Sequence, residues 1–188
     1  MRIIGGNFKG KKISLPKDNK TRPLRDLVKE SIFNLIEHSN KFNCNLKKSV
    51  ILDLFSGTGS FGLECISRDA QKVIFVENYK EALHVLKKNT SIFSQDLNKK
   101  YEIIEENCFN FFNLRKNFNE KFDIIFMDPP YKETKINNII DQIKQKDILR
   151  EGGIIIIHRH KKDNIFISKK IRILEERSYG ISKILIAN

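Results

Sequence analysis

Short apolar runs alternate with amphipathic stretches over the last three quarters of the chain. Runs rich in β-branched and aromatic residues predict buried strands at 50–54, 72–77, 101–105, 122–127 and 153–158. Between them, apolar positions at helical spacing predict helices at 60–68, 80–93, 109–116 and 134–146. Strands that are apolar throughout and separated by helices are typical of a parallel sheet covered on both faces, so we expect an α/β fold.

The two ends of the chain depart from this alternation. Two strand-like runs flank the turn sequence RSYG at 177–180 with no helix between them, which predicts an antiparallel hairpin that closes the sheet. At the other end, MRIIGG and KKISLP suggest a hairpin around Gly10, followed by an amphipathic helix whose start is marked by Thr21 or by Arg22–Pro23. We therefore expect an N-terminal extension over 1–48 and a larger α/β domain over 49–188.

Charge is concentrated in that extension. The chain carries a net charge of +12, and residues 1–48 hold 12 Lys and Arg but only 4 Asp and Glu. An even compositional bias toward Lys would not gather two thirds of the net charge in one quarter of the chain. The distribution therefore favours a polyanionic partner, of which nucleic acid is the most common.

Several classes of protein are disfavoured by the sequence. No run of about 18 apolar residues predicts a membrane span, and the N-terminus lacks the apolar core of a signal peptide. Cys44, Cys65 and Cys108 are odd in number and widely spaced, which indicates neither a zinc site nor a disulfide framework. We expect a cytoplasmic protein without a metal site.

The stretch ILDLFSGTGSFGLE, residues 51–64, carries the first chemical signal. Gly57, Gly59 and Gly62 form G-x-G-x-x-G between a predicted strand and a predicted helix, where glycines allow a tight turn and close approach of a ligand to the backbone. Glu77 ends the next strand, 20 residues after Gly57, a spacing at which an acid binds ribose hydroxyls. The pattern predicts a nucleoside cofactor.

Asp53 bears on which cofactor this is. It lies inside the strand, four residues before Gly57, where a carboxylate could hold the amides of the loop or meet the cationic amino-acid end of S-adenosylmethionine. The pyrophosphate of a dinucleotide would find an acid there unhelpful. The position favours S-adenosylmethionine and leaves NAD open.

A core strand then ends on FMDPPY, residues 126–131. Proline offers no N–H, and a residue before proline is held extended, so the loop is stiff and rich in acceptors. The carboxylate of Asp128 and the carbonyls of Asp128 and Pro129 can accept hydrogen bonds, and Tyr131 offers a face on which a base can stack. Two acceptors could take both hydrogens of an exocyclic amine on a planar ring and direct its lone pair toward a methyl donor.

These motifs resemble those of a known family. DPPY, at 128–131, matches the signature of amino-group methyltransferases that use S-adenosylmethionine. MRIIGGNFKGKKI, TRPLRDLVKESIFNLI and RSYGISKILI resemble the bacterial RsmD family of 16S rRNA guanine-N2 methyltransferases, and the likeness covers essentially the whole chain. It implies a Rossmann-like methyltransferase domain, S-adenosylmethionine as cofactor, and 16S rRNA as partner, within the small ribosomal subunit or an assembly intermediate. We expect a monomer.

The resemblance also implies roles for individual residues. The cofactor would be bound by Asp53, Phe55, Gly57, Gly59, Glu77, Asn78, Asn107 and Cys108, and the reacting guanine by Asp128, Pro129, Pro130 and Tyr131. The RNA would be contacted by Arg2, Lys9, Lys11, Arg22 and Arg25. Two positions depart from the family pattern. Asn107 stands where the family has an Asp that contacts adenine, and His158 stands where it has an acid at the end of the fifth strand. His158 begins the run HRHKK, at 158–162, which could touch RNA but which we interpret as a solvated charge run.

Other readings of the motifs stay open. A DNA adenine-N6 methyltransferase shares DPPY but usually carries a larger target-recognition region. A protein glutamine methyltransferase would normally have Asn in place of Asp128. A non-catalytic RNA-binding module would need neither Glu77 nor DPPY.

Overall fold

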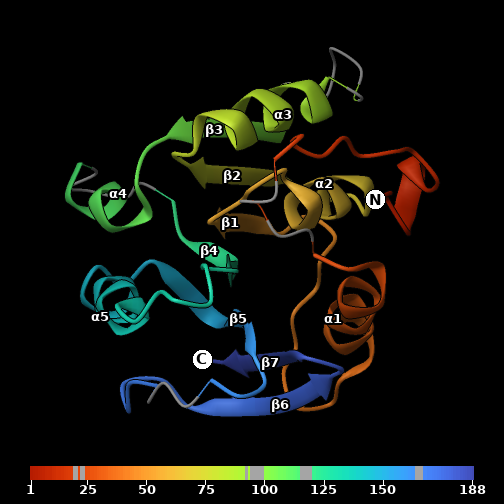
Figure 1. Ribbon diagram of the computed structural model, residues 1–188. Helices are drawn as coiled ribbons and strands as arrows, with labels where there is room; N and C mark the ends of the chain where they lie inside the picture. The colour runs from red at the N-terminus through yellow and green to blue at the C-terminus, as the bar shows by residue number, and fades with distance from the viewer. Residues whose placement is uncertain (19–20, 22–23, 92, 94–99, 115–119, 164–166) are drawn as a thin grey trace.

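A computed structural model describes residues 1–18, 21, 24–91, 93, 100–114, 120–163 and 167–188. They form a seven-stranded sheet in the order β3-β2-β1-β4-β5-β7-β6, with helices on both faces (Figure 1). The strands are β1 (Val50–Leu54), β2 (Lys72–Glu77), β3 (Tyr101–Glu105), β4 (Phe122–Met127), β5 (Leu149–His160), β6 (Ile173–Tyr179) and β7 (Ser182–Ala187). The helices are the 3₁₀ turn η1 (Gly6–Phe8), α1 (Asp26–His38), α2 (Ser60–Ser67), α3 (Lys80–Thr90), α4 (Cys108–Leu114) and α5 (Ile136–Gln145).

The strand directions confirm the predicted fold class. Strands β1 to β5 run parallel to one another, and β7 pairs antiparallel with both β5 and β6. The prediction of β5 as 153–158 was too short. Leu149 already pairs with Phe122, the register shifts before pairing resumes at Ile154, and Gly152 (φ +74°) accommodates the irregularity.

Alternation along the central strands divides the core into two clusters, because successive side chains point to opposite faces of a sheet. One cluster joins Ile51, Phe75 and Phe126 to residues of α1, α2 and α3. The other joins their strand neighbours to residues of α4 and α5. The central strands are therefore buried on both sides, which is why their sequences read as apolar throughout.

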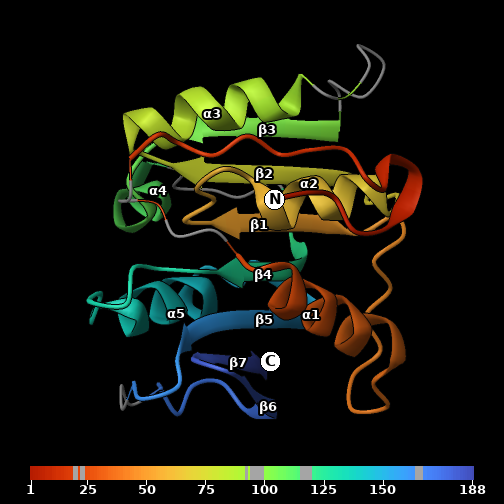
Figure 2. The same cartoon turned by 45° about the vertical axis from the view of Figure 1, so that its right-hand side comes forward.

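The N-terminal extension packs on the first of these clusters. Its two arms pair antiparallel through Ile3 N–H and Lys11 O at 2.9 Å, with η1 in the loop between them. The red N-terminal segment runs beside α2 (Figure 2), where the hydroxyl of Ser67 donates to Gly5 O at 2.6 Å. The helix is present as α1 but begins at Asp26; the expected start at Arg22–Pro23 lies outside the described residues.

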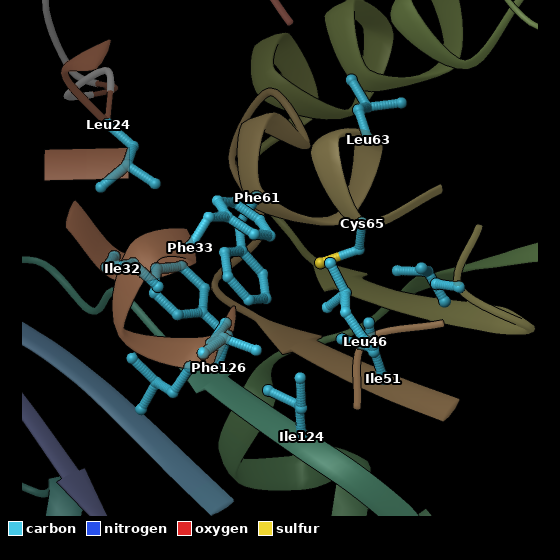
Figure 3. Close-up of a cluster of buried hydrophobic side chains, with 14 of the residues drawn as sticks. Leu24, Ile32, Phe33, Leu46, Ile51, Phe61, Leu63, Cys65, Ile124 and Phe126 are labelled. Carbon is cyan, nitrogen blue, oxygen red and sulfur yellow. The ribbon is translucent and has the colours of Figure 1, made fainter. Parts of the chain in front are cut away.

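Stacked aromatic rings join α1 to the sheet. The ring of Phe61 on α2 stacks on Phe33 of α1 at 5.3 Å and on Phe126 of β4 at 4.0 Å between centroids (Figure 3). Ile3 and Ile13 are buried in the same cluster. The extension therefore shares its core with the α/β domain, although its charge sets it apart.

A buried ion pair also anchors the extension. The Lys29 side chain on α1 is fully buried, and its Nζ donates to Arg2 O at 2.5 Å and lies 3.7 Å from Glu64 Oε2 on α2. Glu64 in turn accepts from Ile4 N–H at 2.7 Å and from Arg68 Nε at 3.0 Å. Burial lowers the pKa of Lys29, and the neighbouring Glu64 carboxylate opposes that shift.

Removing one partner of this pair should destabilise the fold. Lys29→Met leaves Glu64 buried with one cation fewer, and we expect the free energy of unfolding to fall by about 3 kcal/mol in urea denaturation. The matched control is Lys121→Met, because Lys121 pairs with Asp147 where both side chains are about half exposed or more. That change should cost less than about 1 kcal/mol. Equal losses in the two variants would show that burial adds nothing to the Lys29 pair.

Candidate functional site

A pocket of about 480 Å³ opens where the parallel strands end. Leu54 of β1 pairs with Met127 of β4, so the loops that follow both strands start at the same edge of the sheet. Most of the residues predicted to bind the cofactor line this pocket, namely Asp53, Phe55, Gly57, Glu77, Asn78 and Asn107. So do all four predicted catalytic residues, Asp128, Pro129, Pro130 and Tyr131. The sheet thus brings two motifs about 70 residues apart into one cavity.

Gly59 and Cys108 stand behind the pocket wall. Gly59 is buried at φ +80°, and a Cβ there would lie 2.4 Å from a Leu86 methyl group. The buried Cys108 Sγ accepts from Phe55 N–H at 3.2 Å. Phe55 has φ +58°, a left-handed backbone conformation that residues other than glycine rarely adopt. The two residues support the loop rather than line the cavity.

Asp53 is a buried carboxyl group at the base of the pocket. Only 1% of the residue is exposed, and its Oδ2 accepts from Gly62 N–H at 3.1 Å, which ties β1 to α2. Within the described part of the chain, its Oδ1 has no hydrogen-bond partner. Burial raises the pKa of Asp53 well above its usual range, and the Gly62 hydrogen bond only partly opposes this. A buried acceptor of this kind suits a cationic donor from a ligand.

Glu77 fixes the glycine loop to the end of β2. Its Oε2 accepts from Gly57 N–H at 2.7 Å, and its Oε1 accepts from the N–H groups of Asn78 and Tyr79 at 2.9 Å each. A carboxylate offers about four acceptor positions, so these three bonds leave capacity for a hydroxyl. The ribose ligand expected for Glu77 stays a prediction; the structure shows that its carboxylate shapes the loop.

Two residues of β5 hold the DPPY loop. Arg159 is 2% exposed, and its guanidinium donates to the carbonyls of Pro130 at 3.2 Å, Tyr131 at 3.0 Å and Glu133 at 3.0 Å. His158, also 2% exposed, places Nδ1 2.9 Å from Asp128 Oδ1. The interpretation of HRHKK as a solvated run is therefore wrong for its first two residues. The apolar run just before it belongs to the same strand, and it was the signal in the sequence that His158 and Arg159 are buried.

Tyr131 stands beside this strand, half-buried. Its ring meets that of His160 edge to face, with centroids 5.0 Å apart and planes at 82°. The ring therefore has a defined setting at the pocket wall.

The extension reaches the opposite side of the pocket. Thr21 and Leu24 line it, and Tyr79 donates its hydroxyl hydrogen to Asp18 Oδ2 at 2.6 Å. The buried Asn89 amide donates to Ser14 O at 3.1 Å and to Thr58 O in the glycine loop at 3.0 Å, and its Oδ1 accepts from Ser14 N–H at 2.8 Å. Nothing in the sequence singled out Asn89, because its partners are far away along the chain.

The residues predicted to contact RNA lie on the extension. Arg2, Lys9, Lys11 and Arg25 are exposed, and Arg22 lies outside the described residues. Arg2 Nε is 3.5 Å from Asp26 Oδ2, and the Lys11 ammonium lies 4.9 Å from the centre of the Phe8 ring. Their role in binding stays a prediction.

In the described residues, no group of three or more His, Cys, Asp or Glu could hold a metal ion, and no helix is long and apolar enough to cross a membrane.

Comparison with known proteins identifies the family. A family profile described as "Conserved hypothetical protein 95" matches residues 1–188. "Ribosomal RNA small subunit methyltransferase D" of Buchnera aphidicola is 35% identical, over 89% of this chain and 82% of that protein. The Haemophilus influenzae protein of the same name is 30% identical, over 96% of this chain and 90% of that protein. The chain belongs to this family.

Solved structures show the same fold. yhhF from Escherichia coli, described as a methyltransferase, superposes with a TM-score of 0.81 at 21% identity and covers 100% of this chain and 96% of that one. A Haemophilus influenzae protein described as a methylase gives 0.77 at 28% identity, over 100% and 97% of the two chains. The Rossmann-like methyltransferase fold and the family resemblance predicted from the sequence are both confirmed.

The pocket fits S-adenosylmethionine, the cofactor expected of such a fold. Asp53 could accept from the ammonium of the methionine end through its buried Oδ1, and Glu77 could accept from a ribose hydroxyl. Asn107 lines the same cavity and can accept from an adenine amine. The protein thus has a suitable acceptor for the ammonium, for a ribose hydroxyl and for the adenine amine of the ligand.

Cofactor binding should release a proton from Asp53. The raised pKa keeps this carboxyl protonated above the usual range of Asp, whereas a neighbouring ammonium favours the ionised form. Binding therefore lowers the pKa of Asp53, and a proton leaves. Affinity for S-adenosylhomocysteine should then rise with pH until the raised pKa of the free protein is passed. Titration calorimetry in buffers of different ionisation enthalpy measures the proton directly. Asp53→Asn should bind more weakly and with no proton release; release that persists in this variant would contradict the assignment.

Proposed function

We propose that this chain transfers a methyl group from S-adenosylmethionine to the exocyclic N2 amine of a guanine in 16S rRNA, within the small ribosomal subunit or an assembly intermediate. The observation that carries the proposal is the shared cavity, in which the DPPY loop faces the Asp53 and Glu77 carboxyl groups. The names of the family relatives support a small-subunit rRNA substrate. The choice of guanine N2 rests on the resemblance in sequence and on the acceptors of the loop.

The loop supplies acceptors at the place where an amine would react. Because Arg159 takes the carbonyls of Pro130 and Tyr131, we assign amine binding to the Asp128 carboxylate and the Pro129 carbonyl, which precede them. Two acceptors on the two amine hydrogens direct the nitrogen lone pair and stabilise positive charge as it develops on nitrogen. When bound, S-adenosylmethionine supplies an electrophilic methyl group on its sulfonium sulfur.

The nucleobase must leave its stack to reach this loop. A paired guanine cannot insert its amine into a pocket, so the target is unpaired or flipped, and Tyr131 then offers a stacking surface. Lys9, Lys11 and Arg25 on the extension would contact the RNA backbone. Such contacts displace counterions, so binding of the RNA should weaken as salt rises.

A methyl-transfer assay tests the reaction, the base and the substrate class together. Labelled S-adenosylmethionine is offered with unmethylated small subunits, naked 16S rRNA and duplex DNA, and the products are digested to nucleosides. We expect N2-methylguanosine from a ribosomal substrate and none from Asp128→Ala. N6-methyladenosine from DNA would replace the proposal with a DNA methyltransferase. Full activity of Asp128→Ala would remove the loop from the mechanism.

Tyr131 should contribute to capture of the base. Loss of a base–aromatic stack costs about 1–3 kcal/mol, so Tyr131→Ala should lower kcat/KM for RNA correspondingly. Affinity for S-adenosylhomocysteine should change little. Tyr131→Phe is the matched control, since it keeps the ring and its contact with His160. If Tyr131→Ala and Tyr131→Phe were both as active as the unaltered protein, the guanine would not stack here.

A further inference from the structure

His158 lies buried against the carboxylate of the DPPY loop. Its Nδ1 is 2.9 Å from Asp128 Oδ1, and the two side chains are 3% and 12% exposed. When the Asp128 carboxylate is ionised it can only accept hydrogen bonds, and Nδ1 is then the donor. Both the neutral Nδ1–H tautomer and the imidazolium ion provide this donor. With so little water around the pair, the bond is weakly screened and strongly orienting.

Strand register places these two residues side by side. Met127 of β4 pairs with Ile157 of β5 in parallel. The residues that follow them are Asp128 and His158. On its other side, His158 pairs with Ile184 of β7. The backbone of His158 is therefore fixed between two neighbours, whereas Asp128 is the first residue beyond the end of β4. The imidazole therefore gives the Asp128 side chain a hydrogen-bond partner whose position is fixed by a strand.

Arg159 and His158 control different parts of the loop. Arg159 binds the carbonyls of Pro130, Tyr131 and Glu133, which sets the path of the backbone after the motif. The His158 contact instead acts on a side-chain oxygen of the motif, Oδ1 of Asp128. Loss of the imidazole should therefore leave the loop in place and release the torsion of the Asp128 carboxylate.

We propose that His158 is a positioning residue for the methyl transfer. Its Nδ1–H holds Asp128 Oδ1 so that the carboxylate turns its other oxygen toward the exocyclic amine. The proposal rests on the function proposed above and extends it, because His158 itself touches neither the amine nor the methyl donor. A carboxylate with the wrong torsion would meet the amine off line, and misplacement by about 1 Å costs on the order of 10²-fold in rate.

Two variants of His158 separate positioning from bulk. His158→Leu removes the donor, and we expect kcat to fall on the order of 10²-fold while KM for S-adenosylmethionine and for RNA stays within about twofold. His158→Asn puts an amide N–H close to the place of Nδ1 and should restore most of the rate. Thermal unfolding and S-adenosylhomocysteine binding verify that each variant is folded. An unchanged kcat in His158→Leu would overturn the role, and so would an Asn variant no faster than Leu.

A measurement without substrate tests the hydrogen bond itself. The chain has 4 His, and the imidazole nitrogen signals of His158 in the ¹⁵N NMR spectrum are those missing from His158→Asn. We expect a protonated Nδ1 that changes in Asp128→Ala. An unprotonated Nδ1 in the unaltered protein would overturn the proposal by itself. A protonated Nδ1 together with no methyl transfer to any substrate would instead reject the proposed function, and the positioning role with it.

Discussion

Parallel pairing between β1 and β4 is the constraint on which the site depends. Leu54 lies opposite Met127, so the glycine loop and the DPPY loop leave the sheet at the same edge. A slip by one residue would turn every side chain of a strand to the other face and move Asp53 out of the pocket. Close packing on both faces disfavours that slip, because the shifted side chains would no longer fit the buried cluster on either side.

Charged groups then fix the loops that the sheet brings together. Glu77 accepts from three backbone N–H groups at the end of β2, and Arg159 donates to three carbonyls after DPPY. Burying a polar group without a hydrogen bond costs free energy, and here the charged groups bind loop backbone groups that regular secondary structure does not satisfy. The same bonds that solve this folding problem hold the acceptors of the pocket in place before any ligand arrives.

The sequence predicted what depends on local pattern. Strand and helix periodicity gave the parallel sheet and its closing hairpin, and the glycine and DPPY motifs pointed to the residues that line the pocket. The sequence did not predict the contacts of His158, Arg159 and Asn89, because their partners lie about 30 to 75 residues away along the chain. The charged run HRHKK is typical of a solvated segment, and only the structure shows that β5 places its first two residues beneath the DPPY loop. The same limit explains why β5 was predicted too short: its first residues pair across an irregular register.

Charge and packing divide this chain differently. The basic residues of 1–48 set that segment apart as the surface predicted to bind RNA. Its Phe33 on α1 nevertheless stacks on Phe61, which stacks on Phe126 two residues before Asp128. On the other side, Asn89 holds Ser14 and Thr58 together. The extension is therefore linked to both loops of the pocket, through Phe61 on one side and through Asn89 on the other. A segment packed in this way can bind RNA at its exposed face only in a fixed orientation to the site, because its buried face leaves it no independent position.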